Sequence, residues 1–306
     1  MIFDLNCAKC HAPQPKIFCI TNMTSTFKYF IILFSITVLS ACSSFYKPEP
    51  LLNNIAYSTV LELPTTEPSE VIKYGEDSQQ QILFWSPSQA TSFKGLVVLV
   101  HGGCWLSQFD ISHTQAMSIA LATEGYAVWN IEYRRSGNGG EWPVALNDIK
   151  LGVAALSTHK LEGIDLSKIN IVGHSAGGHL AMLAGSELEQ LQLPRESKVK
   201  VIGLAPILDI EVYALGENSC QTATPVFMGG MPDGRKLEYS AANVLNRGFT
   251  ESLEVYSLSG GQDVLVPVSF TQHPDVISHT VDAAGHFDWI HPGTDAFKLL
   301  LSILED

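Results

Sequence analysis

The sequence has few basic residues, few cysteines and no internal repeat. Lysine and arginine number only 18 of 306 residues against 31 aspartates and glutamates, a formal net charge of −13, which excludes the basic surface that binds a nucleic-acid backbone. Six cysteines are too few for a disulfide-stapled fold. No segment of about 33 to 50 residues recurs, which excludes a repeat architecture. Because 46% of the residues are hydrophobic, the chain can bury a large core, and intrinsic disorder is excluded.

The N-terminal region has the layout of an export signal. Lys28 precedes about a dozen mostly apolar residues, a run shorter than the roughly 20 residues that span a bilayer. The run ends in Leu39-Ser40-Ala41-Cys42, which resembles the lipobox of bacterial lipoproteins. This resemblance implies cleavage before Cys42 and acylation of that cysteine, and Ser43 resembles the outer-membrane sorting pattern. We therefore expect residues 1–41 to be an upstream extension and signal peptide, and the mature protein to be lipid-anchored on the periplasmic face of the outer membrane.

A second cysteine motif lies upstream of this signal. Cys7-Ala8-Lys9-Cys10-His11 fits the pattern of c-type haem attachment and also half of a zinc site. Met23 is a natural start for the signal, and the motif precedes it, so we expect it to be absent from the mature chain. The mature chain has no metal-ligand spacing and no phosphate-binding glycine loop. No cofactor and no metal are therefore expected.

The mature chain alternates short apolar runs with helical patterns. Prolines in residues 42–70 predict a tether followed by an edge strand. Strands are predicted at residues 81–85, 96–101, 127–132, 169–173, 199–204, 253–258 and 276–281. Helices are predicted at residues 112–123, 143–158, 176–186 and 295–304. This alternation predicts one α/β domain over residues 71–306, a doubly wound, mostly parallel sheet with helices on both faces. The Gly-, Pro- and Asn-rich segment of about 205–250 is longer than an ordinary connection and predicts a small lid.

A G-x-S-x-G sequence joins one predicted strand to the following helix. Gly173-His174-Ser175-Ala176-Gly177 is a weak signal alone, but a strained strand-turn-helix elbow in this place lifts a serine hydroxyl clear of the sheet. The two glycines are needed because a Cβ at either would collide with the neighbouring strand or helix. Ser175 alone is also compatible with an ordinary helix N-cap.

A serine nucleophile needs a base and an acid that orients the base. His286 follows the last predicted strand, and Asp263 follows the strand at residues 253–258. The carboxyl ends of parallel strands meet at one edge of a sheet, so we expect Ser175, Asp263 and His286 to converge there. Asp282 and Asp288 compete for the acid position, but both are so near His286 in sequence that they cannot easily orient its ring.

A glycine-rich segment follows the strand predicted at residues 96–101. His101-Gly102-Gly103-Cys104-Trp105 resembles the H-G-G-G loop that supplies oxyanion-hole donors in lipases and esterases. Cys104 replaces the third glycine, which is tolerable because backbone donors need no particular side chain, although glycine adopts the required conformation more easily. The resemblance implies that the N–H groups of Gly103, Cys104 and Ala176 face the oxyanion.

From about residue 70 onward the chain resembles α/β hydrolases of the hormone-sensitive-lipase and feruloyl-esterase-like group. The same motifs, with Gly285-His286-Phe287-Asp288, are similar to the kynurenine formamidase branch. The resemblance implies a serine hydrolase that cleaves small carboxylic esters through an acyl-enzyme. Two alternatives remain: an arylformamidase that hydrolyses N-formylkynurenine-type amides, and a non-catalytic envelope lipoprotein that uses the fold for binding. The expected partners are a small-molecule ester or activated amide and, through the lipid anchor, a membrane.

Other residues near these motifs are expected to be structural. Trp105 and Trp142 are expected in core or lid packing, and Asp209 as a loop or cap residue. Arg134 and Arg135 are expected to form ion pairs near Glu132. An oxidising periplasm permits a bond between Cys104 and Cys220, but the sequence offers no geometry for one, so two free thiols are predicted.

Overall fold

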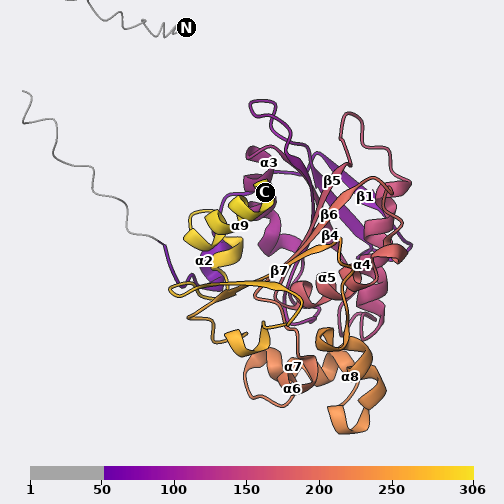
Figure 1. Cartoon of the computed structure of the whole chain (residues 1–306), viewed down its shortest axis with the longest axis vertical. Coiled ribbons are helices and arrows are strands. Elements are labelled where there is room, and N and C mark those ends of the chain that lie inside the picture. Colours follow the sequence, from indigo (N-terminus) through magenta and orange to yellow (C-terminus); the bar gives the residue numbers. More distant parts are fainter. Residues whose placement is uncertain (1–51) are drawn as a thin grey trace, which may run out of the picture. The chain divides into compact units, whose positions relative to one another are not determined.

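A computed structural model of the chain describes residues 52–306 (Figure 1), which are built around one twisted sheet. The strands run in the order β1-β2-β4-β3-β5-β6-β7-β8. Their bounds are β1 (Glu70–Lys73), β2 (Gln81–Trp85), β3 (Gly95–Val100), β4 (Tyr126–Glu132), β5 (Lys168–His174), β6 (Lys198–Leu204), β7 (Glu254–Gly260) and β8 (Ile277–Val281). The β1–β2 and β2–β4 pairs are antiparallel and the other pairs are parallel. The predicted α/β class and mostly parallel sheet are confirmed.

Helices cover both faces of the sheet, because the central strands are apolar on both sides. Every residue of β3 and β4 is buried, as expected of strands inside a parallel sheet. Successive side chains of β3 enter different hydrophobic clusters. One cluster contains α4 (Val144–Ala154) and α5 (Ala176–Ser186), and the other contains α3 (Gln115–Thr123) and α9 (Asp295–Glu305), on opposite sides of the sheet (Figure 1).

The helix bounds differ slightly from the predicted ones. The helix predicted over residues 112–123 starts as a 3₁₀ turn, and the one predicted over residues 143–158 ends as one. The 3₁₀ turns of the described chain are η1 (Ile111–Thr114), η2 (Ala155–Ser157), η3 (Leu188–Leu191), η4 (Pro232–Gly234), η5 (Val244–Asn246), η6 (Val268–Phe270) and η7 (Asp288–Ile290).

The segment before β1 differs from the predicted tether. Residues 57–61 form a short helix, α2 (Tyr57–Leu61), and the side chains of Ile55 and Val60 are buried in the cluster of α3 and α9. The Asp288 carboxylate accepts the N–H groups of Asn54 at 2.8 Å and Ile55 at 2.6 Å. This part of the chain is therefore docked on the domain. The edge strand is β1, which lies at residues 70–73, just after the segment of residues 42–70 in which it was predicted.

The connection between β6 and β7 forms the predicted insertion. It contains α6 (Ile210–Tyr213), α7 (Ser219–Met228) and α8 (Lys236–Ala242), drawn in orange in Figure 1. Asn218 and Gln221 form a reciprocal capping box that begins α7, satisfying N–H groups that have no partner in the helix. Side chains of these helices share the hydrophobic cluster of α4 and α5.

The sequence features upstream of residue 52 lie outside the described residues. These features are the signal peptide, the acylated Cys42 and the C-x-x-C-H motif, and they stay predictions. Within residues 52–306, no helix combines the length and apolar character needed to cross a membrane.

Candidate active site

Ser175 occupies a strained turn between β5 and α5. Its φ of 57° and ψ of −120° lie outside the regions that residues other than glycine usually adopt. Its N–H donates to the Leu204 carbonyl at 2.8 Å. A Cβ at Gly173 would collide with the backbone of Gly177, and one at Gly177 would collide with the carbonyls of β3 and the loop after it. The strand-turn-helix elbow predicted from the sequence is therefore present, and it depends on these two glycines.

Asp263 and His286 form a buried pair at the ends of β7 and β8. Their Nδ1 and Oδ2 atoms are 2.7 Å apart. The other carboxylate oxygen, Oδ1, accepts the N–H groups of Leu265 at 2.9 Å and Val266 at 2.8 Å. The loop after β7 therefore fixes the carboxylate, and the carboxylate fixes the imidazole with Nδ1–H as donor.

The two competing carboxylates do not reach the ring of His286. Asp288 is committed to the backbone of residues 54 and 55, and Asp282 is exposed on the turn after β8. The contact predicted between Asp263 and His286 is confirmed, although the catalytic roles of the two residues stay predictions.

Ser175 and His286 line one cavity of about 220 Å³. Apolar and aromatic side chains from several parts of the chain complete it, and the lining comprises Tyr57, Gly103, Cys104, Leu106, Gln108, Phe109, His113, His174, Ser175, Ser219, Cys220, Leu265, His286 and Phe287. Within residues 52–306, the buried Ser175 hydroxyl has no hydrogen-bond partner. Its oxygen is therefore available to a group that enters the cavity.

Residues 103–105, here called the donor loop, have left-handed backbone conformations. Gly103 has a φ of 108°, Cys104 of 52° and Trp105 of 57°. A Cβ at Gly103 would collide with Phe109, so this position requires glycine. Among the hydrogen bonds of the described residues, none uses the N–H of Gly103 or Cys104. Ala176 is the first residue of α5, so its N–H has no partner within the helix.

The prediction of two free thiols is wrong. Cys104 and Cys220 form a disulfide, with Cα atoms 5.0 Å apart. Cys220 lies in α7, so the bond ties the donor loop to the β6–β7 insertion. The sequence left this pair possible but could not establish it, because the two cysteines are 116 residues apart and meet only when the insertion folds beside the donor loop.

His174, the variable residue of the elbow, is a functional candidate that the sequence motifs did not single out. Its Nε2–H donates to the His286 carbonyl at 2.9 Å, and the two rings are 4.7 Å apart. Burial first, and then the neighbouring His286, hold the pKa of His174 well below its ordinary value. A neutral imidazole therefore holds the loop that carries His286. Its position beside Ser175 in the sequence was the available signal.

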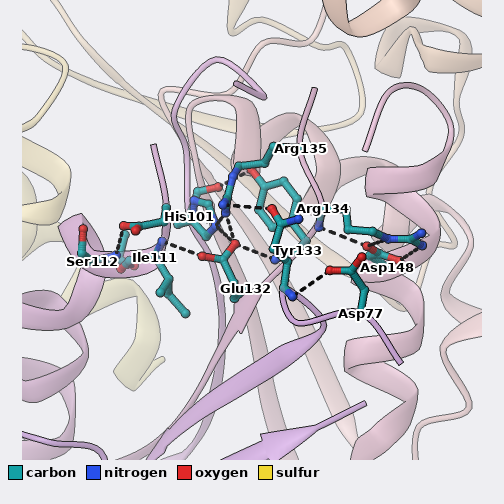
Figure 2. A network of polar contacts seen from close by, with 12 residues as sticks. Asp77, His101, Ile111, Ser112, Glu132, Tyr133, Arg134, Arg135 and Asp148 are labelled. Atoms are coloured by element: carbon teal, nitrogen blue, oxygen red, sulfur yellow. Dashed lines mark hydrogen bonds and ion pairs between the residues drawn. The ribbon is translucent and has the colours of Figure 1, made fainter. Parts of the chain in front are cut away.

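A buried polar network supports the start of the donor loop (Figure 2). The Glu132 carboxylate accepts the N–H of Ile111 at 3.0 Å and of Tyr133 at 2.8 Å, and it contacts His101 and Arg135. Burial favours a raised pKa for Glu132, but His101, Arg135 and the hydrogen bond from the Ile111 N–H lower it below its ordinary value. The Tyr133 hydroxyl donates to the His101 carbonyl at 2.9 Å. The network therefore fixes the chain immediately before Gly102.

The residues expected to be structural have such roles. Arg134 forms a two-point ion pair with Asp148, at 2.9 and 2.7 Å, while Arg135 pairs with Glu132 inside the network. Asp209 caps α6 by accepting the Val212 N–H at 3.2 Å. Trp105 is fully buried, and Trp142 packs edge-on against Phe227. In the described part of the chain, no group of three or more His, Cys, Asp or Glu residues is arranged to hold a metal ion.

The sheet order, the elbow after β5 and the positions of Asp263 and His286 at later strand ends define an α/β hydrolase. More particularly, the chain belongs to the BD-FAE family, whose profile matches residues 83–269.

The chain is also similar to individual proteins named as esterases. The chain is 30% identical over 136 residues to Esterase LipC of Mycobacterium tuberculosis, covering 42% of this chain and 34% of that protein. It is 28% identical over 170 residues to an arylesterase of Saccharolobus solfataricus, covering 55% of this chain and 53% of that protein. The chain thus spans about a third to a half of the length of these curated relatives. Esterase B from Lactobacillus rhamnosis has the same fold, with a TM-score of 0.63, 16% identity and coverage of 92% of this chain and 95% of that one.

Proposed function

We propose that the chain is a serine carboxylesterase in which Ser175 is the nucleophile, His286 the general base and Asp263 the acid that orients it. The observation that carries the proposal is the His286–Asp263 hydrogen bond beside a cavity that His286 shares with Ser175. Relatives named as esterases support the choice of ester substrates.

The reaction proceeds through an acyl-enzyme. Because Nδ1–H of His286 donates to Asp263, Nε2 is the basic nitrogen that takes the Ser175 proton as the hydroxyl attacks the ester carbonyl. The N–H groups of Gly103, Cys104 and Ala176 donate to the oxyanion that forms. His286 then protonates the leaving alcohol, and water attacks the acyl-enzyme by the same route. The Ser175–His286 hydrogen bond forms as the substrate enters, since catalytic hydrogen bonds often tighten only in the complex.

The serine assignment is tested with a fluorophosphonate probe and p-nitrophenyl acetate. Ser175→Ala should remove covalent labelling and ester turnover, because no other group supplies the nucleophile. The matched control is Ser219→Ala, which removes the other serine of the cavity lining and should leave labelling in place. Circular dichroism would establish that both variants fold. Labelling that persisted in folded Ser175→Ala would refute the assignment.

The cavity supports small acyl groups. Its volume of about 220 Å³ is below the roughly 300–1,000 Å³ typical of pockets for drug-sized ligands. We expect kcat/KM to be highest for short esters in a series from C2 to C12 that includes feruloyl esters. Faster hydrolysis of N-formylkynurenine than of any ester would favour the arylformamidase alternative. Folded wild-type protein that the probe fails to label would favour a binding role.

Export and lipid anchoring through Cys42 are part of the proposal. The lipobox-like sequence supports them, and so does the Cys104–Cys220 disulfide, since such bonds persist in oxidising compartments. In a bacterial host fed an alkynyl fatty acid, the wild-type chain should incorporate the label in the membrane fraction. Cys42→Ser should remove the label. A labelled Cys42→Ser protein, or a wild-type protein that keeps residues 23–41, would contradict the anchor.

A further inference from the structure

Two consecutive residues of the donor loop are attached to one helix of the insertion. Cys104 is bonded to Cys220 in α7. The Trp105 ring stacks on Phe227, also in α7, with centroids 4.8 Å apart and planes inclined by 5°. The helix therefore contacts the donor loop through a covalent bond at one residue and an aromatic stack at the next.

These attachments are made by two residues whose backbone conformations are unfavourable. Cys104 and Trp105 both have left-handed φ values, 52° and 57°, which residues with a Cβ rarely adopt and which surrounding contacts must impose. The Cys104 N–H is free of protein partners among the described residues, and its direction depends on this conformation. A group that imposes the conformation therefore also sets the direction of the donor.

The same helix is attached to the loop that carries Asp263. The Asn218 side chain, which caps α7, donates to the Leu265 carbonyl at 2.9 Å, and Tyr213 of α6 donates to the same carbonyl at 2.7 Å. The Leu265 N–H in turn donates to the Asp263 carboxylate at 2.9 Å. The insertion therefore connects the donor loop with the loop after β7 that carries Asp263.

We propose that Cys220 is a positioning residue whose disulfide holds the Cys104 N–H toward the oxyanion, so that ester hydrolysis depends on the oxidised state of this pair. The inference rests on the proposed function. A dithiol reductant would transfer two electrons and two protons to the pair, giving two thiols and a cyclic disulfide of the reductant. Cys104 would then be free to leave the left-handed region, and the donor would turn away from the cavity.

Two variants that both lack the disulfide separate positioning from stability. In Cys220→Ser, an unbonded cysteine remains at position 104. In Cys104→Gly/Cys220→Ser, position 104 carries glycine, which adopts a positive φ readily. We expect the kcat of Cys220→Ser to fall by about 10- to 100-fold, which is no more than the fall caused by removing one oxyanion donor completely. Its KM should change by less than about threefold, because ground-state binding does not use this donor. The double variant should recover kcat to within about fivefold of wild type while still melting below wild type, because it also lacks the disulfide.

Oxidised and reduced wild-type protein provide the matching chemical experiment. Thiol titration of the oxidised protein after unfolding should show no free thiol at positions 104 and 220, and reduction should lower kcat to the value of Cys220→Ser. Reoxidation should restore it. Assays well below the melting temperature, with near-ultraviolet circular dichroism, would establish that the variants are folded.

Several results would overturn the inference. If Cys220→Ser kept the wild-type kcat, or if both variants lost kcat equally, the disulfide would have only a structural role. The proposed function would still stand. Free thiols in the oxidised protein would remove its basis. An oxidised wild type that the probe does not label would refute the proposed function, and the inference with it.

Discussion

Replacing Asp263 with asparagine should separate its action on His286 from its action on the loop. One carboxylate oxygen accepts the Nδ1–H of His286 at 2.7 Å, and the other accepts two backbone N–H groups at 2.9 and 2.8 Å. Asparagine keeps one acceptor for the backbone but presents an NH₂ group to the ring. The imidazole would then carry its proton on Nε2, where it cannot accept the proton of Ser175.

The expected loss is large for activity and small for stability. A wrong imidazole tautomer lowers kcat about 10⁴-fold in a serine triad, which corresponds to about 5 kcal/mol of activation free energy. Asp263→Asn should therefore lose about four orders of magnitude in kcat with little change in the free energy of unfolding. Asp263→Ala should lose as much activity and, in addition, about 1–3 kcal/mol of stability, because the buried Val266 N–H is left without an acceptor.

The assay is steady-state hydrolysis of p-nitrophenyl acetate, with urea unfolding measured on the same preparations. Asp288→Asn is the matched control, because Asp288 is one of the two competing acids but binds the backbone of residues 54 and 55. Its kcat should stay within about tenfold of the wild-type value, a much smaller loss than the roughly 10⁴-fold loss expected of Asp263→Asn. If Asp263→Asn kept most of its kcat, or if Asp288→Asn lost as much, the assignment of the acid would be refuted.

Three further predictions concern buried groups around the site. Burial lowers the pKa of His179 from 6.5 to about 4. The folded state therefore favours the neutral imidazole, and its contribution to stability is full above pH 6.5 and falls as the pH drops toward 4. Between pH 7 and 5, the unfolding free energy measured in urea should fall by about 2 kcal/mol more for wild type than for His179→Gln, and equal falls would disprove the linkage. Glu132→Gln removes the charge that pairs with the buried Arg135 and should lower the free energy of unfolding in urea by about 3–5 kcal/mol. A loss below about 1 kcal/mol would show that the fold does not need this ion pair. Gly177→Ala places a Cβ against the carbonyls of His101 and Val100 and should abolish fluorophosphonate labelling even where the protein folds; normal labelling would mean that the elbow tolerates the methyl group.

The fold could be predicted from local patterns because the buried strands differ in amino-acid composition from the rest of the chain. The apolar runs of β3 and β4 are buried along their whole length, which gives them a composition that turns and helices do not share. Boundaries were less accurate at the helix ends, where 3₁₀ turns precede α3 and follow α4. The docking of residues 52–61 was missed because the prolines nearby indicate an extended chain and do not show what lies against it.

The local order of residues determined the α/β architecture, the serine elbow and the glycine-rich donor loop, since each depends on steric and periodic preferences that act over a few neighbouring positions. The order of the strands also predicted the Asp263–His286 contact, but only the tertiary structure decided that Tyr57 lines the cavity and that Cys104 is bonded to Cys220. Those contacts join segments distant in the chain, and their formation depends on how whole elements pack, which no short stretch of sequence specifies.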